Sequence, residues 1–145
     1  MNDILLVNAG ATLALTGLVW FVQLVHYPLF DRVSADQFPR FVQSHLRLSV
    51  LIVGPLMLAE VVTSVILVMD TPGSISRQQV WLGFVLVFLI WLSTALLQIP
   101  QHQVLEKRYD VRAHELLVVS NWIRTSAWTA RSILVVGMLR GSMTL

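Results

Sequence analysis

Residues 80–101 read VWLGFVLVFLIWLSTALLQIPQ and contain no Asp, Glu, Lys or Arg. A helix needs roughly 20 mostly apolar residues to cross the hydrocarbon core of a bilayer. Three further stretches are similarly apolar, at residues 4–26, 45–69 and 116–139. The sequence therefore predicts one all-α transmembrane domain over residues 1–145, with four membrane-spanning helices.

The composition agrees with a membrane protein. Hydrophobic residues make up 56% of the 145 residues and charged residues only 12%, against roughly 25% charged residues in a typical soluble protein. The net charge is +2 and cysteine is absent, which disfavours a nucleic-acid partner, a disulfide framework and a thiolate metal site. The signatures of serine hydrolases, nucleotide-binding loops and helical zinc motifs are also missing.

The connections between the spans are short, which favours an up-down-up-down four-helix bundle. Basic residues are concentrated around the connections at 27–44 and 102–115, and the positive-inside rule places these connections in the cytoplasm. Both termini then lie outside the cytoplasm, most simply across a bacterial inner membrane. The cytoplasmic set is Arg32, Arg40, Arg47, Lys107, Arg108 and Arg112, and the opposite side has Arg77 and Arg140.

Each predicted span brings one histidine to the cytoplasmic face. His26 closes the first span, His45 opens the second and His114 precedes the fourth. We interpret Pro100 as the end of the third span, which then places His102 at its close. Polar side chains in a bilayer turn inward, because lipid offers them no hydrogen bonds. Imidazoles at one level can bind copper, iron or zinc, or hold a haem from both sides. The sequence thus predicts a metal or haem site, the alternative being interfacial histidines without a ligand.

Further polar residues continue the histidine-bearing helix faces into the membrane. Gln98 lies four residues before His102, and Asn121 and Trp128 follow one face of the last span. Arg124 has no obvious acidic partner in any span, so it could bind backbone carbonyls, Gln98, or an anionic group such as a propionate, a quinone oxygen or a lipid phosphate. Of the arginines, we most expect Arg124 to touch a ligand. We expect Arg124, Gln98, Asn121 and Trp128 to bind a cofactor or substrate, with simple packing as the alternative for Trp128.

Two charged residues lie deeper in the predicted spans. Glu60 comes 15 residues after His45, and Arg131 comes 17 residues after His114. At a rise of about 1.5 Å per residue, both lie roughly 23–25 Å from the histidine level. A buried carboxylate and a buried guanidinium at one depth should pair, because an unpaired charge is costly there. We interpret them as a structural ion pair, with a proton or anion relay as the alternative.

Two segments carry resemblances to known families. The stretch Ile99-Pro100-Gln101-His102, followed by Asn121-Trp122-Ile123-Arg124-Thr125, resembles the anthrone oxygenase-like family of small four-helix bacterial membrane proteins. This chain differs from that family in having His102 where the family has asparagine. The stretch from Trp20 to Leu29 more distantly resembles HemJ-type protoporphyrinogen oxidases, which are four-helix haem proteins. Both resemblances imply redox chemistry in the membrane, and they assign no catalytic residue.

Three functions are compatible with these features. The first is a membrane oxidoreductase or oxygenase that uses copper, iron or haem on a hydrophobic substrate such as a quinone, porphyrin or aromatic. The second is a non-catalytic accessory subunit of a larger membrane complex for pigment binding or electron transfer. The third is a small transporter that uses Glu60 and Arg131.

Overall fold

The computed structural model describes residues 2–143, which form helices and turns without a β-strand. The elements are α1 (Asn2–Phe21), η1 (Val22–His26), η2 (Pro28–Arg32), α2 (Phe38–Met69), α3 (Arg77–Ser93), η3 (Thr94–Gln98), α4 (Ile99–Leu105) and α5 (Val111–Met143). The π-helical turns η1 and η3 continue the helices before them, so the chain forms four rods. The predicted all-α class is confirmed for these residues.

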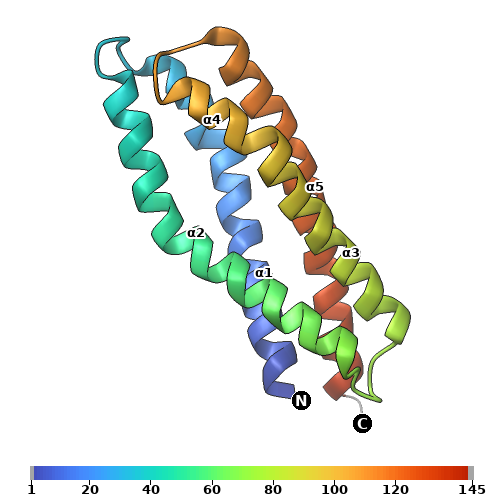
Figure 1. Cartoon of the computed structure of the whole chain (residues 1–145). Coiled ribbons are helices and arrows are strands. Elements are labelled where there is room, and N and C mark those ends of the chain that lie inside the picture. The colour runs from blue at the N-terminus through green and yellow to red at the C-terminus, as the bar shows by residue number, and fades with distance from the viewer. Residues whose placement is uncertain (1, 144–145) are drawn as a thin grey trace.

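The four rods lie side by side along their length (Figure 1). α1 packs against α2 and α5, and α3 packs against α5 and α2. The described chain ends and the turn at 70–76 lie at one end of the molecule, and the turns at 33–37 and 106–110 lie at the other. We call the latter the histidine end, because His26, His45, His102 and His114 lie toward it.

The helices are longer than the predicted spans. α2 begins at Phe38 rather than near His45, the third rod continues past Pro100 to Leu105, and α5 begins at Val111. His45, His102 and His114 therefore lie within helices, and the prediction that Pro100 ends the third span is wrong. Hydropathy identifies only the apolar part of a helix. Arg and Gln have high helix propensity, so the helix can continue into polar sequence beyond that part.

Two local features explain how helices begin and bend. Ser76 and Gln79 form a capping box at the start of α3, and the Asp110 carboxylate accepts a hydrogen bond from the Ala113 N–H at 2.9 Å at the start of α5. Pro55 lies inside α2, where it cannot donate to the carbonyl one turn earlier. α2 bends near its middle (Figure 1), and this bend carries its first half away from α3.

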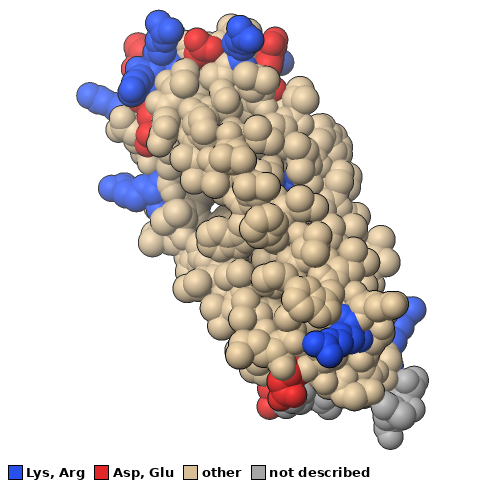
Figure 2. Space-filling view, turned by 45° about the vertical axis from the view of Figure 1, so that its right-hand side comes forward, with Lys and Arg blue, Asp and Glu red and all other residues tan. Residues whose placement is uncertain are grey.

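Three of the described helical segments are long and apolar enough to cross a membrane: Asp3–Arg32, Phe38–Met69 and Arg77–Leu105. The predicted fourth span at 116–139 does not meet the same measure. Its helix, α5, instead buries a polar stripe that includes Asn121, Thr125 and Arg131. On the face shown in Figure 2, most charged side chains gather at the two ends of the molecule and the surface between them is largely uncharged.

Candidate functional site

The four predicted metal ligands meet around Tyr27 at the histidine end. His26 Nε2 and His45 Nδ1 share a hydrogen bond of 2.8 Å. The Tyr27 hydroxyl lies 3.1 Å from His102 Nε2, and His114 Nε2 donates to the Tyr27 carbonyl at 2.7 Å. The rings of His45 and His102 are 5.9 Å apart between centroids. All four rods therefore contribute one imidazole to this cluster.

The π-helical turns help to place these side chains. η1 ends at His26, and the Tyr27 N–H bonds to the Val22 carbonyl five residues earlier at 2.9 Å. η3 ends at Gln98, four residues before His102. A π-helical turn adds one residue to the helical repeat and is frequent at functional sites. Each π-helical turn thus rotates the side chains that follow it about the helix axis, relative to a continuous α-helix.

The imidazoles are engaged in hydrogen bonds to different extents. His114 uses both nitrogens, because the Tyr109 hydroxyl also lies 3.3 Å from its Nδ1. His102 has no partner at Nδ1. Within residues 2–143, no group of three or more His, Cys, Asp or Glu side chains is arranged to hold a metal ion. The geometry therefore shows a hydrogen-bonded histidine cluster, and the metal and haem site stays a prediction.

An apolar cavity of about 330 Å³ lies directly beneath this cluster. Its walls are mainly aliphatic and aromatic side chains from all four rods. The predicted cofactor-binding residues Arg124, Gln98, Asn121 and Trp128 all line it, together with Tyr27, His45, Ser49 and His102. The structure thus brings these residues to one space.

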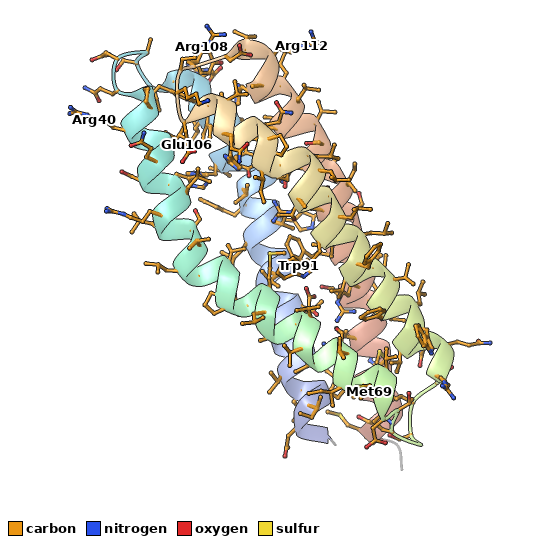
Figure 3. All side chains as sticks on the ribbon, viewed as in Figure 1. Arg40, Met69, Trp91, Glu106, Arg108 and Arg112 are labelled. Carbon is orange, nitrogen blue, oxygen red and sulfur yellow. The ribbon has the colours of Figure 1, made fainter. Side chains whose placement is uncertain are left out.

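The cavity lies where α2 diverges from α3 and η3. Trp91 is visible in the space between α2 and α3 (Figure 3), and it is one of the lining residues. Val50 of α2 and Ile99 of α4 also line the cavity, and both are exposed on the flank of the bundle. The cavity can therefore be reached from the apolar side of the molecule rather than only from its charged end.

Three polar atoms at this cavity are buried without a hydrogen-bond partner: Gln98 Oε1, His102 Nδ1 and Arg124 Nε. Buried polar atoms are nearly always bonded, since an unmade bond costs free energy. Arg124 otherwise stacks over Trp128, with 5.0 Å from its guanidinium carbon to the ring centroid, and donates to Asn121 Oδ1 at 3.4 Å. No carboxylate in the described part of the chain forms an ion pair with it.

A second group of polar side chains lies on the far side of Trp128 from Arg124, and its buried polar atoms all have hydrogen-bond partners. Arg131 Nε donates to Glu60 Oε1 at 2.8 Å, which makes the buried ion pair expected from equal depth. Its Nη1 donates to the Gly83 carbonyl at 2.6 Å, and its Nη2 donates to Asn8 Oδ1 at 2.9 Å. We call this set of residues, with Thr12, Ser64 and Trp128, the ion-pair layer; all four rods supply a member.

Sequence reasoning missed several of these residues. Tyr27, the centre of the histidine cluster, falls in a segment that hydropathy assigns to a connection. Asn8 and Thr12 hold the ion-pair layer from α1. With Thr16, they form a polar stripe spaced by four residues in an otherwise apolar span, and this spacing is the signal that identifies an inward face.

Comparison of the chain with models of protein families, with curated proteins and with solved structures finds no match. The resemblances to the anthrone oxygenase-like and HemJ-type families therefore rest on the two sequence segments alone.

Proposed function

We propose that this chain is an integral membrane protein that binds a hydrophobic small molecule in the cavity beneath the histidine cluster. Its four rods would cross the bilayer up-down-up-down, with the histidine end in the cytoplasm. Three apolar helices and the largely uncharged middle of the face in Figure 2 support the membrane location. α5 would be the fourth span, with Arg124 at the cavity and Arg131 in the ion-pair layer.

The observation that carries the binding function is the cavity with its three unpartnered polar atoms. Small-molecule sites are concave, mostly apolar, and contain a few polar groups that orient the ligand. This cavity has those features, and a ligand would supply the bonds that Gln98, His102 and Arg124 lack. The exposed rim at Val50 and Ile99 would admit the ligand from the lipid phase.

Membrane integration predicts that the protein stays with the membrane when peripheral proteins are removed. Membranes from cells that express the chain are washed with alkaline carbonate and then with mild detergent. We expect the protein in the pellet after carbonate and in the supernatant after detergent, because only detergent replaces lipid around an apolar surface. Release by carbonate alone would contradict the membrane location.

Ligand binding predicts saturable uptake of an apolar probe by the folded protein. In equilibrium dialysis, lipid nanodiscs with the protein should take up naphthalene at one site beyond the amount held by protein-free nanodiscs. Gly54 lines the cavity and has open space around it, so Gly54→Trp should fill the cavity and weaken binding about tenfold or more, given about 0.8 kcal/mol per buried methylene lost.

The matched control places the same side chain outside the cavity. Gly17 is exposed on α1 and also has open space around it, so Gly17→Trp should leave the affinity for naphthalene unchanged. Equal loss in both variants, or no saturable uptake by the unmodified protein, would refute ligand binding in the cavity.

The other proposed functions differ in their support. Redox chemistry through copper, iron or haem stays a prediction. The two imidazoles that lie nearest to each other, and so could most readily share a metal ion, are those of His26 and His45, whose nitrogens are 2.8 Å apart. The bonding of Arg131 and Glu60 to Asn8, Thr12, Ser64 and Trp128 supports a structural role over a transport role. An accessory role in a larger membrane complex also stays a prediction.

A further inference from the structure

The amide of Gln98 offers an acceptor to the cavity. Its Nε2 donates to Ser120 Oγ at 2.7 Å, and the Ser120 hydroxyl donates onward to the Leu117 carbonyl at 3.4 Å. This chain of donors fixes the orientation of the amide, because the Ser120 oxygen is then the acceptor. Gln98 Oε1 remains unbonded, and the residue is only 1% exposed.

His102 offers a donor to the same cavity. The Tyr27 hydroxyl lies 3.1 Å from His102 Nε2, and this is the one hydrogen bond of that hydroxyl among residues 2–143. Because the Tyr27 O–H has no other acceptor there, we assign it as the donor to His102 Nε2. The neutral His102 ring then carries its proton on Nδ1, which has no partner.

Arg124 offers a second donor. Its Nε–H is buried and unpartnered, and no described carboxylate balances its charge through an ion pair. The polar end of the cavity thus presents one acceptor, Gln98 Oε1, and two donors, His102 Nδ1–H and Arg124 Nε–H. A ligand group that satisfies all three must donate once and accept twice.

We propose that the polar end of the bound molecule is a hydroxyl group, an inference that rests on the proposed ligand-binding function. A hydroxyl has one O–H donor and two acceptor lone pairs, which match Gln98, His102 and Arg124. An ether or ketone lacks the donor. A carboxylate turns a second acceptor toward Gln98 Oε1, which leaves that atom unbonded and repelled. The hydrophobic body of the molecule lies among the cavity's aliphatic and aromatic walls, which include Trp91 and Trp128.

The test compares probes of one size that differ only in their polar group. Equilibrium dialysis against protein-loaded and protein-free nanodiscs gives the affinity of naphthalene, 2-naphthol, 2-methoxynaphthalene and 2-naphthoate. We expect 2-naphthol to bind about tenfold more tightly than naphthalene and 2-methoxynaphthalene, because only it satisfies the three buried atoms. The saturated alcohol decahydro-2-naphthol shows whether the hydroxyl must be on an aromatic ring. An affinity equal to that of 2-naphthol indicates that aliphatic and aromatic hydroxyls are both accepted. An affinity below that of 2-naphthol but above that of naphthalene indicates a preference for a phenol.

Gln98→Leu provides the variant test. It should lower the affinity for 2-naphthol to that for naphthalene, while unchanged naphthalene binding shows that the variant is folded. Gln103 is an exposed amide on the same rod, and Gln103→Leu should leave both affinities unchanged. If Gln98→Leu fails to fold, the probe series on the unmodified protein decides.

The outcomes separate this inference from the function on which it rests. Saturable naphthalene binding with no preference for 2-naphthol, or a preference for 2-naphthoate, overturns the hydroxyl assignment and keeps the ligand-binding cavity. Absence of saturable binding by every probe overturns both.

Discussion

Arg131→Met is expected to lower the free energy of unfolding by about 3–5 kcal/mol, because it leaves a buried carboxylate without its partner. In the folded protein, Glu60 is fully buried and Arg131 is 2% exposed. The substitution also removes the donors to Gly83, Asn8 and Ser64, so bonds to α1, α2 and α3 are lost together. Unfolding of the detergent-solubilised protein, followed by circular dichroism, measures the loss.

Two controls identify the cause of that loss. Arg77→Met removes an exposed arginine and should change stability by less than about 0.5 kcal/mol. The double variant Glu60→Met with Arg131→Met removes both charges, and it should be more stable than Arg131→Met alone, since the uncompensated charge is gone. A double variant less stable than Arg131→Met would show that the ion pair is not the source of the effect.

The ion pair is also the clearest case of what the sequence allows one to predict. Glu60 is the one acidic residue of the stretch at 45–69, and Arg131 is one of two arginines in the stretch at 116–139. Their depths follow from the helical rise. The same logic predicts that the four histidines lie at one level and that Gln98, Asn121, Arg124 and Trp128 face the interior, where they line the cavity. Periodicity and the cost of burying polar groups are local properties of the sequence, so these features are visible in it.

Other features depend on how the helices pack and are not visible in hydropathy. The two π-helical turns shift the facing of His26, Tyr27 and His102, and no composition signal distinguishes a π-helical turn from α-helix. The cavity arises where α2 diverges after the bend at Pro55, and the proline predicts a bend but not its direction. The helices also extend beyond the predicted spans, because apolarity stops before helical structure does.

The packing of the helices also requires that residue 83 has no Cβ. We therefore expect Gly83→Ala to destabilise the protein. A Cβ at this position would lie 2.8 Å from Arg131 Nη1 and 3.4 Å from Leu134 Cδ2. Nη1 belongs to a guanidinium held by Glu60, Asn8 and Ser64, so it cannot move away without loss of those bonds. Losing the charged bond to the Gly83 carbonyl alone should cost about 1.5–3 kcal/mol.

The matched control is Gly10→Ala, which makes the same change in α1 at an exposed position with nothing within 4 Å of the new Cβ. Alanine is favoured over glycine inside a helix by up to about 1 kcal/mol, so this variant should be as stable as the unmodified protein or slightly more stable. The two substitutions therefore act in opposite directions in the same unfolding measurement. If both variants shift stability alike, the guanidinium has room beside α3, and the close packing of Gly83 against Arg131 does not contribute to stability.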